Sequence, residues 1–352
     1  MIRLPGLIDP HVHLRYLDPV KEDFSTGTNA AIAGGYTMIL DMPNNNPPIT
    51  TIERLQAKIN HASQYARCDI GFYFGSLGDN LDEFHKIINL VYGLKLYLNV
   101  TTGGYIIDEK SLNIIYKKWN EVTNGKKPIL LHAEEDVFEM VERVLKATPH
   151  PTHIVHVSTE EELIKIISLK KNGFPITCGV CPHHLFLKND DLQKLGPYGI
   201  MKPSLKTKTD QEFLWENIQY IDIIESDHAP HTKEQKESEN PPSGVPGLET
   251  TLPLLLTAMS KNKITKDDII RLCHTGPKEI FHLPIQPYTY IDIDENIEYE
   301  IKNENLFTKC KWTPFNGFKV KGRVVKVVLR GETIFENGKI IDTQKKAHIL
   351  HE

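Results

Sequence analysis

Short apolar runs rich in β-branched residues recur along most of the chain and alternate with longer segments of helical periodicity. Glu160–Lys171 has the 3.6-residue spacing of an amphipathic helix, and the Asn172 and Gly173 that follow are typical of a helix end. Eight of the apolar runs are predicted to be strands: Leu4–Leu14, Thr37–Pro43, Asp69–Gly75, Gly93–Leu98, Pro128–Glu134, Thr152–Ser158, Ile176–Pro182 and Asp222–Pro230.

The number and order of these elements predict the fold class. Eight strands, most of them followed by a helix, are the count of an α/β protein with a (β/α)8 TIM-type barrel. The strands are apolar almost throughout, which is typical of parallel strands buried on both faces. We therefore expect a barrel over residues 4–287, with a doubly wound open sheet as the alternative.

The hydrophobic pattern changes at about Tyr288. The segments YTYIDIDENIEYEI and VKGRVVKVVLRGETIFENGKII alternate polar and apolar residues with period two, and a turn-like sequence lies at 336–338. We expect residues 288–352, together with residues 1–3, to form a small β appendage on the barrel.

Composition excludes several classes of protein. A chain of 352 residues with 40% hydrophobic and 25% charged residues suits one large barrel with an appendage. Lys and Arg are scattered and the formal net charge is −5, so we expect no nucleic-acid partner. No apolar run approaches the roughly 20 residues that span a bilayer, and the N-terminal sequence lacks the order of a signal peptide. We expect a cytoplasmic protein that acts on a small-molecule substrate away from membranes.

The cysteines indicate a reducing compartment. Five cysteines, an odd number, are spread along the chain, which argues against a disulfide framework. Cys178 and Cys181 form a C-x-x-C sequence, but no second pair lies at the spacing of a zinc ribbon. We interpret these two as ordinary buried thiols.

Side chains that commonly bind metals occur at the ends of predicted strands. His11 and His13 are two residues apart, so on one strand both point to the same face. His132 ends the fifth predicted strand, His156 the sixth and Asp227 the eighth. Active sites of this fold lie at the C-terminal ends of the strands. A single histidine there is usually structural, but four imidazoles and a carboxylate at one barrel mouth predict a zinc site.

Lys95 lies in the fourth predicted strand, within GLKLYL. A buried lysine usually pairs or extends toward solvent, and an ammonium group among metal ligands would repel the metal. A desolvated, uncharged amine can instead add carbon dioxide and become a carbamate, whose two oxygens can bridge two metals. Two zinc ions bridged in this way, and by a hydroxide, would polarise an amide carbonyl and supply the nucleophile.

Several segments resemble the amidohydrolase superfamily and, within it, the dihydroorotases. They are PGLIDPHVHLR, the MPN after Asp41, GLKLYL, HAE, SDHAPH, KEDFSTGT, CPHHLFL, PGLETTLPLLLTA, IFHLP, KWTPFNGFKVKG and VVLRGE. The resemblance extends from Arg3 to about Gly338 and is closest to the dihydroorotase domain of animal-type multifunctional chains. It implies reversible cyclisation of N-carbamoyl-L-aspartate to L-dihydroorotate in pyrimidine biosynthesis.

The resemblance also implies how two zinc ions are held. His11, His13 and Asp227 would hold one ion. His132 and His156 would hold the other, and carboxylated Lys95 would bridge the two. It further implies that Asp227 is the general base and acid.

A clamp for the free carboxylate of the substrate is implied as well, formed by Arg15, Asn44 and His231. The guanidinium fork of arginine pairs with a carboxylate through two parallel hydrogen bonds. Arg15 follows His13 by two residues, so we expect its side chain to point from the same strand face into the mouth.

Other positions depart from the family's pattern. Lys202 stands where the family has an arginine of the substrate pocket, which keeps the charge and loses the fork. Thr101 and Thr102 stand where relatives have Thr-Phe, and we expect residues 99–104 to be a mobile lid whose threonines contact the substrate. Val155 and Gly179 replace a cysteine and a glutamate of the family's third zinc site, so we expect two zinc ions per chain.

Two alternatives remain open at this stage. One is a cyclic amidohydrolase of the hydantoinase or allantoinase type, and the other is a non-catalytic barrel that serves as an assembly scaffold. The resemblance implies a homodimer, and it implies carbamoyl phosphate synthetase and aspartate transcarbamoylase domains in the same longer chain as partners.

Overall fold

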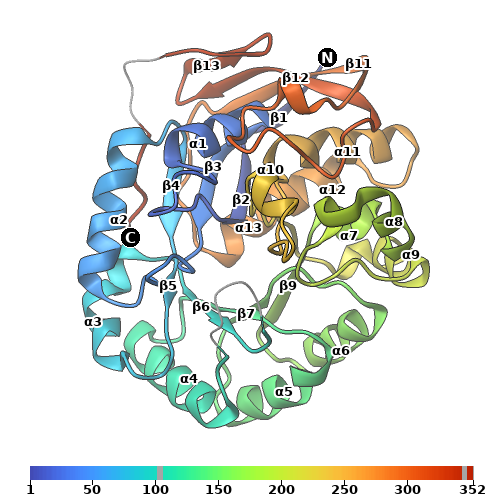
Figure 1. Cartoon of the computed structure of the whole chain (residues 1–352). Coiled ribbons are helices and arrows are strands. Elements are labelled where there is room, and N and C mark those ends of the chain that lie inside the picture. The colour runs from blue at the N-terminus through green and yellow to red at the C-terminus, as the bar shows by residue number, and fades with distance from the viewer. Residues whose placement is uncertain (101–105, 343–346, 352) are drawn as a thin grey trace.

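The structure, a computed structural model, describes residues 1–100, 106–342 and 347–351. Strands around its centre form the barrel wall, and helices lie outside them (Figure 1). The wall strands are β2 (Leu7–Val12), β3 (Tyr36–Asp41), β4 (Asp69–Phe72), β5 (Phe74–Gly75), β6 (Leu94–Tyr97), β7 (Ile129–His132), β8 (Thr152–Ile154), β9 (Ile176–Val180) and β10 (Ile223–Ile224).

Strand pairing follows the order of a (β/α)8 barrel. The pairs from β2 to β4 and from β5 to β10 are all parallel, in chain order. Only Tyr73 separates β4 from β5, so these two form one run of the wall. A parallel bridge between Val12 and His228 joins the first strand to the segment after β10. The predicted α/β barrel is therefore confirmed, and the open sheet is excluded.

Helices surround the wall, with α2 to α6 forming much of the outer ring in Figure 1. The predicted helix Glu160–Lys171 is confirmed as α6, whose first turn is closed by reciprocal hydrogen bonds between Thr159 and Glu162. The helices are α1 (Phe24–Ala33), α2 (Ile52–Tyr65), α3 (Phe84–Ile87), α4 (Glu109–Thr123), α5 (Phe138–Ala147), α6 (Glu160–Lys171), α7 (Pro182–Phe186), α8 (Leu192–Leu195), α9 (Lys208–Glu216), α10 (Lys233–Lys236), α11 (Leu248–Ser260), α12 (Lys266–Ile270) and α13 (Gly276–Ile280). None of the helices in the described ranges is both long and apolar enough to cross a bilayer.

The predicted strand Leu4–Leu14 is wrong as one element, because the chain changes sheets at Gly6. A side chain at position 6 would place its Cβ 2.2 Å from Thr37 Oγ1, so only glycine fits between β1 (Ile2–Pro5) and β2. β1 leaves the barrel and pairs with β11 of a second sheet.

That second sheet is antiparallel and lies along one edge of the barrel, at the top of Figure 1. Its strands, in spatial order, are β1 (Ile2–Pro5), β11 (Tyr290–Glu300), β12 (Lys319–Leu329), β13 (Glu332–Glu336) and β14 (Lys339–Ile340). The segment near the C-terminus instead contacts the barrel: the Ile70 amide of β4 donates to His348 O, and the Leu350 amide donates to Ile70 O.

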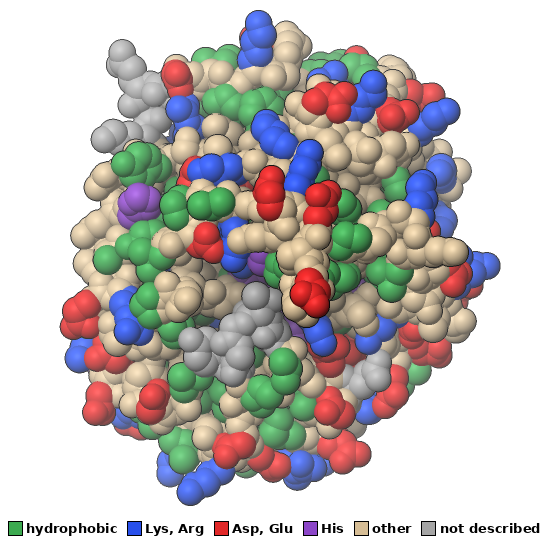
Figure 2. Space-filling model, viewed as in Figure 1, with side chains coloured by type: hydrophobic (Ala, Val, Ile, Leu, Met, Phe, Trp, Pro, Cys, Tyr) green, Lys and Arg blue, Asp and Glu red, His purple; other side chains and the backbone are tan. Residues whose placement is uncertain are grey.

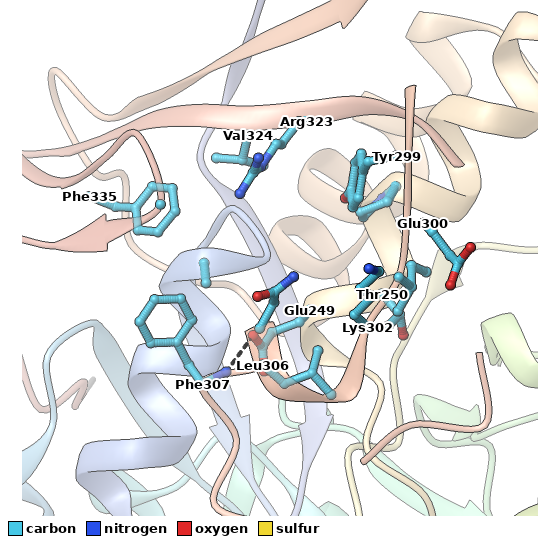
Figure 3. A pocket seen from close by; sticks show the side chains of 15 residues that line it. Glu249, Thr250, Tyr299, Glu300, Lys302, Leu306, Phe307, Arg323, Val324 and Phe335 are labelled. Atoms are coloured by element: carbon cyan, nitrogen blue, oxygen red, sulfur yellow. Dashed lines mark hydrogen bonds between the residues drawn. The ribbon is translucent and has the colours of Figure 1, made fainter. Parts of the chain in front are cut away.

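A cavity of about 430 Å³ lies between α11 and the second sheet (Figure 3). Glu249 accepts hydrogen bonds there from the backbone amides of Phe307 at 2.7 Å and Thr308 at 2.9 Å. Burial raises the pKa of Glu249 to about 7, although both hydrogen bonds act in the opposite direction. None of the candidate metal ligands lines this cavity, so it is separate from the site described next.

Candidate metal centre

The six predicted metal ligands converge on one pocket at the mouth of the barrel. Figure 2 shows histidine side chains inside the hollow near the middle of this face. All six side chains are buried, and all six line the pocket: His11, His13, Lys95, His132, His156 and Asp227.

Three of them form one group of ligand atoms. Asp227 Oδ1 lies 3.3 Å from His11 Nε2 and 3.1 Å from His13 Nε2, and one ligand atom of each residue lies within 4.8 Å of the others. Burial lowers the pKa of His13 to about 4, so at neutral pH its ring is in the uncharged form that binds metals. The pKa of Asp227 is also low, because the two histidines outweigh the effect of burial. A carboxylate and two imidazoles suit one zinc ion.

His132 and His156 form a second pair. His132 Nδ1 lies 2.9 Å from His156 Nε2, and the rings meet edge to face. His156 Nδ1 is buried without a hydrogen-bond partner in the described part of the chain. Burial lowers the pKa of both rings, which keeps them neutral. Two neutral ring nitrogens that face each other this closely, His132 Nδ1 and His156 Nε2, are donors that one metal ion could share.

Lys95 lies in β6 with 1% of its surface exposed. Its Nζ contacts the carbonyl oxygen of Leu96 at 3.3 Å and lies 3.8 Å from the centre of the Tyr97 ring. Burial lowers the pKa of Lys95 to about 7, so a large fraction of the amine is uncharged near neutral pH. This is the form that can react with carbon dioxide.

The backbone at three site residues departs from the predicted strands. His156 and Asp227 were predicted to end strands, but they follow β8 and β10 and have φ values of 43° and 45°. Arg15, expected on the face of a strand, likewise follows β2 and has a φ of 55°. Residues other than glycine rarely adopt this left-handed conformation, and it concentrates at functional sites. The prediction that these three side chains share the barrel mouth is correct, but the strand geometry offered for it is wrong.

Three polar residues, Glu225, Asn44 and Glu134, contact ring nitrogens of the histidines His11, His13 and His132. Glu225 Oε2 lies 3.3 Å from His11 Nδ1, opposite the ring nitrogen that faces Asp227. Asn44 Oδ1 lies 2.6 Å from His13 Nδ1, and Glu134 Oε1 lies 3.1 Å from His132 Nε2. The hydrogen bonds at His13 and His132 fix the ring tautomer and leave the other nitrogen free for a metal, whereas Glu225 acts on His11 as a nearby charge. Glu225 and Glu134 were not predicted from the sequence, although both lie close to recognised ligands, in ESDHAP and HAE.

The predicted substrate clamp is brought together only in part. Arg15, Asn44 and Lys202 line the pocket, and Lys202 is exposed. Arg15 donates from Nε to the carbonyl oxygen of Pro230 at 3.1 Å, and its Nη2 lies 3.2 Å from His231 Nε2. His231 is fully buried behind Arg15 and does not line the pocket.

Two predicted residues, Thr101 and Thr102, lie outside the described residues. Tyr97, which was not singled out from the sequence, lines the pocket beside Lys95.

Comparisons with known proteins define the class and then the family. The amidohydrolase family matches residues 2–158. The dihydroorotase of Pyrococcus horikoshii is 36% identical over an alignment 378 residues long, gaps included, which covers 100% of this chain and 85% of that protein. The chain therefore belongs to the dihydroorotase family of amidohydrolases.

More similar relatives are parts of much longer proteins. The multifunctional protein CAD of Squalus acanthias is 45% identical over 97% of this chain, and the multifunctional protein pyr1-3 of Dictyostelium discoideum is 42% identical over 97%. This chain spans only 15% of the length of each.

Solved structures share the fold. L-hydantoinase from Arthrobacter aurescens superposes with a TM-score of 0.93 at 23% identity, over 100% of this chain and 89% of that one. An inactive dihydroorotase-like domain of a CAD-like multifunctional protein from Chaetomium thermophilum gives a TM-score of 0.83 at 26% identity, over 97% of both chains.

Proposed function

We propose that this chain is an active dihydroorotase, which interconverts N-carbamoyl-L-aspartate and L-dihydroorotate. The observation that carries the proposal is the presence of a half-buried guanidinium, Arg15, in the same pocket as six buried side chains suited to two metals. Membership of the dihydroorotase family supports the same reaction.

The donors in the pocket suit two zinc ions. His11, His13 and Asp227 would hold one, His132 and His156 the other, and a carbamate on Lys95 would bridge them. The close approach of His132 Nδ1 to His156 Nε2, at 2.9 Å, and the burial of every donor support this assignment. When bound, two zinc ions would polarise the ring carbonyl and make a water molecule acidic enough to react.

Asp227 is the residue that moves the proton. Its pKa is held low, so it is an unprotonated carboxylate at neutral pH and has a place for the transferred proton. In hydrolysis it takes a proton from the attacking water and delivers it to the departing ring nitrogen. In cyclisation it takes the proton from the ureido nitrogen.

Arg15 selects the substrate by its carboxylate. Hydantoins and dihydropyrimidines present the same kind of amide as dihydroorotate, so the metals alone cannot distinguish these rings from dihydroorotate. The half-buried guanidinium of Arg15 can, because it pairs strongly with the carboxylate that only dihydroorotate carries. The likeness to hydantoinases is a likeness of fold at 23% identity and does not favour their substrates.

A substrate panel tests this proposal. Purified, metal-quantified protein is assayed with L-dihydroorotate, dihydrouracil and hydantoin at equal concentrations. We expect dihydroorotate to be preferred by about a hundredfold or more. Equal turnover of dihydrouracil would replace the proposal with a hydantoinase-type activity, and no turnover of any ring would favour an assembly scaffold.

The assembly around this chain is also proposed from its relatives. Because the multifunctional proteins contain this region as a small part of their length, we propose carbamoyl phosphate synthetase and aspartate transcarbamoylase domains as neighbours in a longer chain. A homodimer is proposed from the family resemblance alone.

A further inference from the structure

A second group of metal-binding side chains lies at the end of β9, outside the pocket just described. Cys181, His183 and His184 each offer one ligand atom, and these atoms all lie within 4.8 Å of one another. None of the three lines the mouth pocket. The group is local in sequence, because Cys181 directly precedes α7 and the two histidines lie in its first turn.

Both histidines carry ring nitrogens that nothing in the described chain satisfies. His183 Nε2 and His184 Nδ1 are buried without hydrogen-bond partners, and each residue is only 2% exposed. Cys181 is fully buried and forms no disulfide. Buried polar atoms are nearly always paired, so unpaired nitrogens beside a thiol call for an explanation. A bound cation would supply one.

The surroundings of the group favour a cation over an anion. Burial raises the pKa of the Cys181 thiol, and the carboxylates of Asp227, Glu225 and Asp9 raise it further, so negative charge is disfavoured here unless a cation accompanies it. One sulfur and two imidazole nitrogens are the donor set of soft and borderline metals, above all zinc. Calcium and magnesium are excluded by the same donors, because those ions require oxygen ligands.

We propose that Cys181, His183 and His184 form a zinc site separate from the catalytic centre, so that the chain binds three zinc ions and not the two expected from Val155 and Gly179. The three protein donors leave one position of a tetrahedral ion for water. A thiolate ligand distinguishes this site chemically, since the donors of the catalytic centre are nitrogen and oxygen atoms alone.

The site would stiffen the segment that carries Lys202. His184 uses its other ring nitrogen, Nε2, to contact the carbonyl oxygen of Pro203 at 3.1 Å. Pro203 directly follows Lys202, which lines the substrate pocket. An ion on His184 would therefore hold α7 and the Lys202 segment in one arrangement, which is a structural role.

Cobalt substitution tests the site without depending on activity. The full-length protein is stripped of metal and reloaded with Co²⁺, and its near-ultraviolet spectrum is recorded. A thiolate bound to Co²⁺ gives an intense charge-transfer band, whereas a purely nitrogen and oxygen site does not. We expect this band in the wild-type protein, with a metal content one equivalent above that of Cys181→Ser.

Cys178→Ser is the matched control. Cys178 is also fully buried and lies on β9, three residues before Cys181, but it belongs to no ligand group in the described residues. The band should persist in Cys178→Ser and disappear in Cys181→Ser. Absence of the band from cobalt-loaded wild-type protein would overturn the proposal even if a variant failed to fold. So would a band that survives in Cys181→Ser. Neither result would bear on dihydroorotase activity, which is measured separately.

Discussion

The carboxylate of Glu225 occupies the space that a side chain at position 179 would need. A Cβ built on Gly179 would lie 2.5 Å from Glu225 Oε1. Glu225 Oε1 also accepts a hydrogen bond from the backbone amide of His156 at 2.5 Å, and Glu225 Oε2 lies 3.3 Å from His11 Nδ1. Gly179 therefore allows Glu225 to reach the back of the metal centre and orient His11.

Gly179→Ala should weaken metal binding by about tenfold or more, because it displaces a carboxylate that orients a ligand. The measurement is the zinc that the protein retains against a graded series of chelator concentrations. Glu225→Ala should have a similar effect.

The double variant is the control for this prediction. In the Glu225→Ala background the clash is gone, so adding Gly179→Ala should cost little more. If the losses of zinc affinity of the two single variants simply added in the double variant, Gly179 would act through something other than Glu225.

Lys95→Ala should lose most of its bound zinc and nearly all turnover, because the bridging carbamate cannot form. A small carboxylate such as acetate, added with zinc, should restore part of the activity by filling the vacated space. Native mass spectrometry gives an independent check. The wild-type chain should be heavier than its sequence by one carbon dioxide, and this mass should be lost in acid. An unmodified lysine in fully active, zinc-loaded protein would contradict the bridging role.

Arg15→Gln should lower kcat/KM for dihydroorotate by about a hundredfold while zinc content stays near normal. Arg15→Lys should recover only part of the loss, since it restores the charge but not the fork. Steady-state kinetics and elemental analysis of the same samples measure both quantities. If zinc were lost in parallel with activity, Arg15 would maintain the structure of the metal centre and would not act by binding the substrate.

Glu249, in the cavity beside the second sheet, should make folding stability depend on pH. Burial raises its pKa from 4.5 to about 7, so the folded protein holds this proton more tightly than the unfolded chain does. The contribution of Glu249 to the free energy of unfolding is fully present below about pH 4.5 and is lost as the pH rises through about 7.

Glu249→Gln removes this titration, because an amide stays neutral throughout the range. Urea unfolding at several pH values should show the wild type losing stability relative to Glu249→Gln as the pH rises. Parallel stability curves for the two proteins would show that Glu249 is not perturbed in this way. The lost hydrogen bond of the glutamine variant shifts its curve by a constant amount and leaves the slope unaffected.

Most of the fold and the metal ligands could be predicted from the sequence because both depend on short-range patterns. The apolar runs identify the barrel strands, and His11, His13 and His132 are recognisable by their place in those runs. The strand ends could not be predicted, since the chain leaves the wall early at β8 and β10 to hold His156 and Asp227 in a left-handed backbone.

Contacts between distant segments were also beyond the sequence analysis. Glu225 reaches His11 across more than two hundred residues of sequence, and it fits only because Gly179 on the neighbouring strand lacks a side chain. Gly179 was interpreted only as a lost ligand. Similarly, Cys181 was interpreted as an ordinary thiol, because the unpaired nitrogens of His183 and His184 become visible only when burial is known.

The most direct test of the central claim is the turnover of L-dihydroorotate during metal reconstitution. Protein stripped of metal is titrated with zinc in the presence of bicarbonate, and activity is followed with the bound metal counted at each step. The account predicts no turnover without metal and full, reversible turnover once the catalytic centre holds two zinc ions. A folded, zinc-loaded chain that neither opens dihydroorotate nor closes N-carbamoyl-L-aspartate would contradict it.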